Sequence, residues 1–241
     1  DPALTYQITS GNLVNSDTLS GGLTRVAGET VLGGPYAIQQ GTLANSNYAI
    51  TYVGANLSIT ARPITVNADG QTKTYGDADP ALTYQITSGN LVNSDTLSGG
   101  LTRVAGETVL GGPYAIQQGT LANSNYAITY VGANLSITAR PITVTADAKT
   151  KVYGDADPAL TYQVTSGNLV GADTLSGALT RVAGETVLGG PYAINRGSLG
   201  ITDFNYAITY VGANLSITAR PITVTADAKT KVYGDADPAL T

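Results

Sequence analysis

The chain has 241 residues, a net charge of −5, 12% charged residues and no Cys, His, Met or Trp. Without Cys or His it lacks disulfides, thiol nucleophiles, the commonest general base and the commonest metal ligand, so we expect no enzyme. There is no basic patch to neutralise phosphates, and no apolar run reaches the length of a bilayer span. We therefore expect no contact with nucleic acid or membrane in this segment.

A repeat of nearly constant length organises the sequence. The phrase Arg-Pro-Ile-Thr-Val begins at Arg62, Arg140 and Arg220, at spacings of 78 (140 − 62) and 80 (220 − 140) residues. This period suits a small domain better than a solenoid turn. We therefore expect a partial repeat at 1–61, complete repeats at 62–139 and 140–219, and the start of a further repeat at 220–241. Because the sequence opens inside a repeat, we expect it to be an excerpt from a longer polypeptide.

Within a repeat, alternating apolar and polar residues predict short strands. In chain order these segments are 82–87, 113–116, 126–130, 135–138 and, in the next repeat, 142–145. Turn residues separate them at 88–90, 105–107, 111–112 and 131–134. The predicted class is all-β and mainly antiparallel, a tandem array of small β-sandwich or β-grasp-like domains. Helical turns are expected at 79–82 and 93–97, where an Asp stands at a capping position, and a loop is expected between Gly197 and Tyr206.

The junctions between repeats carry no flexible linker. Apolar residues fall on odd positions at Leu57 and Ile59 but on even positions at Ile64 and Val66. A slip of one residue reverses the faces of a strand, and Pro does not serve inside a central ladder. One strand should therefore end and another begin at each junction, and the array should form an elongated, stiff rod. The junction residues are Arg62, Pro63, Arg140, Pro141, Arg220 and Pro221.

Three aspartates recur in each repeat. They are Asp147, Asp155 and Asp157, with counterparts at Asp69, Asp77 and Asp79. Neighbouring carboxylates could bind calcium, which prefers oxygen ligands, and calcium could stiffen the array. In the other interpretation Asp157 caps a turn that begins with Pro, and Asp155 belongs to a Gly-Asp turn. No established calcium-loop pattern is present, which favours turns, and we expect no other cofactor.

Two further sets of residues have alternative interpretations. Lys151, Glu185 and Asn214 recur at matching positions and could form an amide crosslink, although Lys151 is expected to be exposed. Tyrosines follow the strand alternation and should belong to the core or its edge with their hydroxyls at the surface, or could stack on sugar rings. The absence of Trp weakens the sugar-binding interpretation. These tyrosines are Tyr84, Tyr114, Tyr126 and Tyr130.

The segment 151–162, Lys-Val-Tyr-Gly-Asp-Ala-Asp-Pro-Ala-Leu-Thr-Tyr, resembles the MBG-type repeats of the YGX subtype found in long secreted bacterial adhesins. The blocks at 173–177, 191–194 and 205–208 are also similar to that family. The resemblance implies a stalk or filament of a secreted adhesin at the bacterial surface or in the biofilm matrix, and no catalytic residues. Its structural signature recurs at Tyr75-Gly76, Tyr153-Gly154 and Tyr233-Gly234.

Two functions remain open at this stage. In the first, the repeats are a structural stalk that gives reach and stiffness to the rest of the same long polypeptide. In the second, the repeats themselves bind extracellular polysaccharide or other adhesin chains, because many weak linked sites gain avidity. Near-verbatim repetition is not expected of an enzyme.

Overall fold

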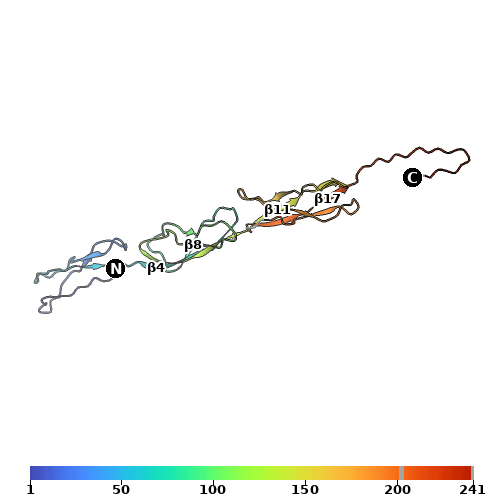
Figure 1. The fold of residues 1–241 in the computed structure, drawn as a ribbon. Coiled ribbons are helices and arrows are strands. Elements are labelled where there is room, and N and C mark those ends of the chain that lie inside the picture. Colours follow the sequence, from blue (N-terminus) through green and yellow to red (C-terminus); the bar gives the residue numbers. More distant parts are fainter. Residues whose placement is uncertain (201–203, 240–241) are drawn as a thin grey trace. The chain divides into compact units, whose positions relative to one another are not determined.

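The computed structural model describes residues 1–200 and 204–239, which form two compact units, Asp1–Thr138 and Ala139–Thr241. The described residues form strands and no helix, so the predicted all-β class is confirmed (Figure 1). None of them therefore belongs to a helix long and apolar enough for a membrane crossing. Each unit is described by itself below.

The complete repeat of the first unit contains two small mixed sheets. One has the strand order β6-β4-β9 and the other the order β5-β10-β8-β7. The predicted strand segments overlap β6, β8, β9 and β10, whereas no predicted segment covers β5 or β7. The strands are β4 (Arg62–Ala68), β5 (Gln71–Thr74), β6 (Tyr84–Ser88), β7 (Thr102–Arg103), β8 (Tyr114–Gln117), β9 (Tyr126–Val131) and β10 (Ala133–Thr138).

The first and last strands of this repeat run parallel to each other. β4 pairs with β9 from Arg62↔Tyr126 to Asn67↔Val131, and β5 pairs with β10 up to Thr74↔Thr138. The other pairs, β4–β6, β8–β10 and β7–β8, are antiparallel. The turn predicted at 131–134 is wrong, because β9 continues into β10 after a single residue along this parallel partner. The chain therefore enters the repeat at one end of the paired strands and leaves at the other.

The second unit repeats this arrangement. Its sheets have the orders β13-β11-β16 and β12-β17-β15-β14, and β11 and β17 are labelled in Figure 1. Residues 201–203 of the loop predicted between Gly197 and Tyr206 lie outside the described residues. The strands are β11 (Arg140–Ala146), β12 (Lys149–Val152), β13 (Tyr162–Ser166), β14 (Thr180–Arg181), β15 (Tyr192–Asn195), β16 (Tyr206–Val211) and β17 (Ala213–Thr218).

The apolar side chains of the strands form the core. In β4, Ile64 and Val66 are buried and pack with Leu121 and Tyr126, whereas in β10 the buried residues stand on odd positions. The buried positions are therefore even at the start of a repeat and odd at its end, as the predicted change of phase at the junction requires. Pro63 is the second residue of the central strand β4, and pairing with β6 begins only at Thr65, so its missing N–H interrupts no antiparallel ladder.

The segment predicted as a helical turn at 93–97 folds differently. Asn93 and Ser94 have φ angles of 54° and 59°, and the Asp95 N–H donates to the Val92 carbonyl at 2.8 Å. Two successive left-handed residues form a tight reversal, which Asn tolerates better than most residues. The other helical turn, predicted at 79–82, is also not formed. The Asp79 carboxylate, which was expected to cap it, accepts hydrogen bonds from the Lys73 and Arg103 side chains.

The two incomplete repeats show what strand formation requires. Residues 1–61 form only the three-stranded sheet of β1 (Thr24–Arg25), β2 (Tyr36–Gln39) and β3 (Ala55–Leu57). Residues 48–53 have the sequence of β9, and residues 220–232 have the sequence of 140–152, yet neither segment is a strand. These segments lack their paired neighbours, so tertiary pairing and not local sequence decides their structure.

Candidate functional site

A network of two buried cations and two exposed carboxylates joins the second sheet of the repeat to its loops. Lys73 of β5 donates from Nζ to Asp79 Oδ1 at 2.7 Å and to Glu107 Oε2 at 2.5 Å. Arg103 of β7 donates from Nε to Asp79 Oδ2 at 2.6 Å and also pairs with Glu107. The Lys73 side chain is only 5% exposed, so two cations and two carboxylates neutralise one another beside the core.

Local structure places each member of this network. Lys73 occupies an inward position of β5, and Asp79 follows the turn at Tyr75-Gly76. Arg103 also donates to the Gly106 carbonyl at 2.7 Å, which holds the loop that carries Glu107. The Arg103 guanidinium lies 5.5 Å from the centre of the Tyr114 ring, an arrangement that adds a cation–π attraction.

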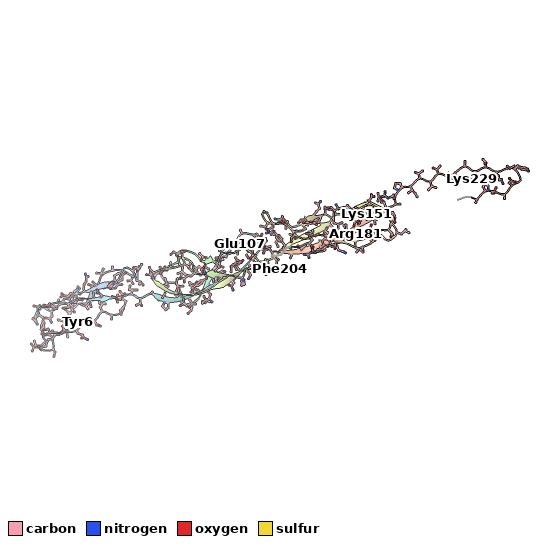
Figure 2. All side chains as sticks on the ribbon, viewed as in Figure 1. Tyr6, Glu107, Lys151, Arg181, Phe204 and Lys229 are labelled. Atoms are coloured by element: carbon pink, nitrogen blue, oxygen red, sulfur yellow. The ribbon has the colours of Figure 1, made fainter. Side chains whose placement is uncertain are left out.

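The same network recurs in the second unit, and a reduced form of it occurs in the partial repeat. Figure 2 shows Lys151 and Arg181 together in the second unit, where Lys151 Nζ donates to Asp157 Oδ1 at 2.6 Å and Arg181 Nε donates to Asp157 Oδ2 at 2.5 Å. Both cations also pair with Glu185. In the partial repeat, Arg25 pairs with Asp1 and Glu29, but residues 1–61 contain no lysine.

The ion pairs keep all four groups charged. The Arg103 and Lys73 hydrogen bonds lower the pKa of Asp79 to about 2, and those from Lys73 and Arg103 lower the pKa of Glu107. Burial acts to lower the pKa of Lys73, but its bonds to Asp79 and Glu107 outweigh this effect and the pKa is raised. In the second unit, Arg181 and Lys151 lower the pKa of Asp157 to about 2.

This geometry bears on the crosslink hypothesis. The prediction that Lys151 is exposed was wrong, because the residue is only 7% exposed, and the structure brings it to Glu185 but leaves Asn214 exposed on β17. Amide formation needs a neutral amine and an uncharged carboxyl group. The pKa of Lys151 is raised and that of Glu185 is lowered, so both shifts favour an ion pair over an amide.

We expect this network to make folding stability depend on acid. A carboxylate whose folded pKa is lowered contributes stability above its unfolded pKa, about 3.8 for Asp and about 4.5 for Glu. That contribution falls as the pH approaches about 2, where Asp79 and Asp157 are half protonated even in the fold. Urea titrations followed by circular dichroism between about pH 5 and about pH 2 measure the loss.

A comparison of Lys151→Met with Lys149→Met tests whether the ion network causes that acid dependence. Lys149 bonds the Thr161 hydroxyl at 2.6 Å and no carboxylate, so its substitution should leave the acid dependence of unfolding unchanged. The Lys151→Met chain should instead be less stable at pH 7 and lose less stability on acidification. Equal acid dependence in the two variants would contradict the assignment.

The structure brings the Tyr-Gly signature and a junction arginine together. The Asp155 N–H donates to the Val152 carbonyl at 3.0 Å across a turn in which Gly154 has a φ of +87°, a conformation that favours glycine. Arg220 donates from Nε to the Tyr153 carbonyl at 2.8 Å and pairs with Asp155. The residue that opens the segment 220–241 is therefore bound to the turn of the repeat before it.

The other Tyr-Gly pairs lie in turns, and two of the three Arg-Pro pairs open a strand. Tyr75-Gly76 forms the corresponding turn of the first unit and donates from the Tyr75 N–H to the Thr138 carbonyl at 2.9 Å. Tyr233-Gly234 forms the turn again in the C-terminal segment, where Gly234 has a φ of +93°. The first and second residues of β4 and β11 are Arg62-Pro63 and Arg140-Pro141, whereas Pro221 lies outside any strand.

The three recurring aspartates are directed to different partners. Asp147 accepts from the Thr161 hydroxyl at 2.5 Å, Asp155 pairs with Arg220, and Asp157 belongs to the ion network. In residues 1–200 and 204–239 no group of three acidic side chains is placed to hold a metal ion. Calcium binding stays a prediction, which melting curves recorded with calcium and with a chelator can check.

The tyrosines chosen from the sequence are mostly committed to the fold. Tyr114 and Tyr126 are buried, and their hydroxyls donate to the Thr108 carbonyl at 2.8 Å and to Asp95 at 2.9 Å, so the expected surface position of these hydroxyls was wrong. Tyr84 and Tyr130 are partly buried. Tyr153 is 49% exposed instead, in an open depression that it lines with apolar side chains, including those of Val187, Leu188 and Ile222.

The arginine of the network was missed in the sequence. Arg103 and Arg181 stand in the phrase Thr-Arg-Val-Ala-Gly-Glu, which occurs at 24–29, 102–107 and 180–185. An arginine repeated four residues before a glutamate, with a lysine and an aspartate repeated six residues apart, is a signal for paired charges. The strand alternation alone did not reveal it, because these residues come together only through tertiary structure.

Comparison with known families identifies the repeat. The family model described as MBG domain (YGX type) matches residues 1–58, 64–136 and 142–216. No curated protein and no solved structure was found to match the chain. The family is one of structural repeat modules typical of extracellular surface proteins, not of enzymes. Since the matches cover most of the sequence, the chain belongs to the MBG domain family of the YGX type, as a tandem series of its repeats.

Proposed function

We propose that these repeats are load-bearing segments of a stalk or filament in a bacterial cell-surface or biofilm-matrix adhesin. In this function they give reach and stiffness and transmit tension between other parts of the polypeptide. The family assignment supports a module of extracellular surface proteins. That the repeats bear tensile load is inferred from the way their strands are paired.

The observation behind this inference is the parallel pairing of the first and last strands of each complete repeat. In the second unit β11 pairs with β16 from Arg140↔Tyr206 to Thr145↔Val211, and β12 pairs with β17 from Lys149↔Leu215 to Val152↔Thr218. Force applied where the chain enters and leaves pulls these strands along their length in opposite directions. All the hydrogen bonds between them then resist together, because none can break before the strands slide.

Further contacts reinforce the C-terminal end of this strand pair, where β12 and β17 finish. The Thr218 hydroxyl donates to the Lys151 carbonyl at 3.3 Å, and the Tyr153 N–H donates to the Thr218 carbonyl at 2.9 Å. The ion network holds β12 to the loop that carries Glu185. The thirteen residues 206–218, which contain β16 and β17, span about 40 Å, so each repeat adds reach on that scale when its strands lie along the load.

The junctions provide support for stiffness. No Gly/Ser or Pro-rich linker separates the repeats in the sequence. Arg220 is held by the Tyr153 carbonyl and by Asp155 at the end of its preceding repeat. Within the first unit, the Val31 N–H of the partial repeat donates to Asn125 Oδ1 of the complete repeat at 3.0 Å. Such bonds restrict bending where one repeat meets the next.

Single-molecule stretching of the chain tests the load-bearing function. Pulled by its ends, the chain should give two force peaks, one for each complete repeat. Each peak should release about 240 Å of contour length, from about 3.6 Å for each residue of the 78-residue period less about 40 Å of folded span. Extension of the chain to its full contour length without force peaks would contradict the proposal.

A change of pulling direction is the control. The chain has no cysteine, so Pro141→Cys/Ala207→Cys supplies two defined attachment points. These positions are register partners at the same end of the β11–β16 pair. Pulling them apart breaks the ladder bonds one after another, and we expect a rupture force several-fold below that for end-to-end pulling. Equal forces in the two directions would exclude the strand pair as the resisting element.

The second candidate function, binding by the repeats themselves, has support of a different kind. Tyr153 offers an exposed ring for stacking on a sugar, and apolar side chains surround it. Retardation of the chain on matrix polysaccharide, abolished by Tyr153→Ala, is the expected result if the repeats bind glycans. The tensile proposal does not depend on that outcome.

A further inference from the structure

The connection between the first two strands differs in one residue between the two complete repeats. It is Asp69-Gly70 between β4 and β5, but Asp147-Ala148 between β11 and β12. Asp69-Gly70 is the only Asp-Gly pair in the sequence, which contains no Asn-Gly pair. The fold does not require glycine there, because Gly70 does not have a positive φ and a Cβ on it would lie 3.8 Å from its nearest neighbour, the Asn134 main-chain oxygen.

An aspartate that precedes glycine can close a five-membered ring with the main chain. The Gly70 nitrogen attacks Cγ of the Asp69 carboxyl group, a Cγ–O bond breaks, and a water molecule leaves with the amide proton. Water then opens the succinimide ring. When the bond from the nitrogen to the Asp69 main-chain carbonyl carbon breaks, the product is isoaspartate, whose chain runs through Cβ and Cγ. A side chain on the attacking residue hinders the first step, so glycine favours it.

The structure leaves both reacting groups accessible. Gly70 is exposed and lies outside the strands, and none of the described residues accepts a hydrogen bond from its N–H. The Asp69 side chain is half-buried, and the Thr83 hydroxyl donates to its Oδ2 at 2.7 Å. This bond draws electron density from Cγ, which makes that carbon more open to attack by the neighbouring nitrogen.

The pairing of the strands on either side of this connection shows what isoaspartate would change. Asn67 pairs with Val131, and Gln71 pairs with Leu135. The two pairings are therefore four residues apart on both sides of the ladder (71 − 67 and 135 − 131). Isoaspartate at position 69 adds one main-chain atom to one side and none to the other, so the strands cannot keep both registers without distortion.

We propose that Asp69-Gly70 is a site of spontaneous isoaspartate formation, through which the repeat 62–139 loses stability with age while the repeat 140–219 does not. The modification needs no reactant other than water, which is released in the first step and taken up in the second. It goes beyond the proposed function, because the chemistry depends only on the connection between β4 and β5. Its mechanical consequence, one repeat that unfolds first under load, rests on the proposed function.

Prolonged incubation of the whole chain in warm, neutral buffer tests the chemistry. Peptide mapping by tandem mass spectrometry, with labelling by an isoaspartate-specific methyltransferase, should find at least several-fold more isoaspartate at Asp69 than at Asp147. Deamidation at an Asn-Ser pair such as Asn93-Ser94 is distinguished because it raises the peptide mass, whereas isomerisation of aspartate does not. No isoaspartate at Asp69, or equal amounts at the two positions, would overturn the proposal.

Exchange of one residue between the repeats supplies matched variants. Gly70→Ala gives the repeat 62–139 the connection that the other repeat already has, and a Cβ has room there, so the variant should fold normally and form little isoaspartate. Ala148→Gly should create a new site at Asp147. If the amount of isoaspartate is unchanged in both variants, the glycine is not its cause and the proposal fails.

Unfolding of the aged chain tests the structural consequence. In thermal melts followed by circular dichroism, one transition of the aged chain should move to lower temperature, and limited proteolysis should place the new cleavage sites within 62–139. The aged Gly70→Ala variant should unfold as it does when fresh. Isoaspartate at position 69 without a change in unfolding would contradict the loss of stability. The stretching experiment uses fresh chain, so failure of the load-bearing function and failure of this proposal are recognised separately.

Discussion

Replacing Val144 by Asp is expected to unfold the repeat that contains it. Val144 is completely buried in β11, between Val164 of β13 and Tyr210 of β16. An ionised carboxylate at that position has no cation to pair with and would remain desolvated, which costs about 4 kcal/mol or more and is a large part of the stability of a small domain. Circular dichroism should show the loss of one cooperative transition, and limited proteolysis should place the new cleavage sites within 140–218.

The same substitution at Val224 is the control. Residues 220–233 repeat the sequence of 140–153, but Val224 is 84% exposed. Val224→Asp should therefore leave the thermal unfolding of the complete repeats unchanged. If Val224→Asp destabilised the repeats as much as Val144→Asp, the segment 220–233 would have to be packed in the fold.

This identical pair of segments also shows how far the sequence predicts the structure. The Tyr-Gly turn forms in both, because the Asp155 and Asp235 N–H groups donate to the Val152 and Val232 carbonyls at 3.0 and 3.1 Å. The strand forms only in 140–152, where β13 and β16 lie on either side. Turn signals are local and can be predicted from a few residues, whereas a strand needs partners from elsewhere in the chain.

The ion network was not predicted from the sequence, for a related reason. In the structure Lys73 stands at an inward position of β5, and a lysine is normally exposed unless acids lie beside it. One of those acids, Glu107, stands 34 residues away. The resemblance to MBG repeats indicated the family correctly, but family and alternation together did not predict the parallel pairing of the first and last strands. That pairing follows from long-range topology.

A single methyl group at Gly184 is expected to destabilise the complete repeat 140–219 severely. Gly184 has a φ of +148°, and a Cβ at this position would lie 1.9 Å from Cε1 of the buried Tyr192 ring. Gly184→Ala therefore combines a backbone conformation reserved for glycine with a clash inside a packed core. We expect a loss of about 3 to 5 kcal/mol in the free energy of unfolding, measured by urea titration.

Gly171→Ala in the same repeat separates the clash from the backbone conformation. Gly171 has a φ of +57° with no atom within 4 Å of its missing Cβ, and its counterpart Asn93 adopts a φ of 54°. The cost there should be about 1 kcal/mol, from the left-handed conformation alone. Gly184 also precedes Glu185 in the ion network, so its substitution should weaken resistance to stretching as well as thermal stability. Similar decreases in the free energy of unfolding for the two alanine variants would mean that the Tyr192 ring is free to move aside. The loop that carries Glu185 would then not be held by its packing against Tyr192.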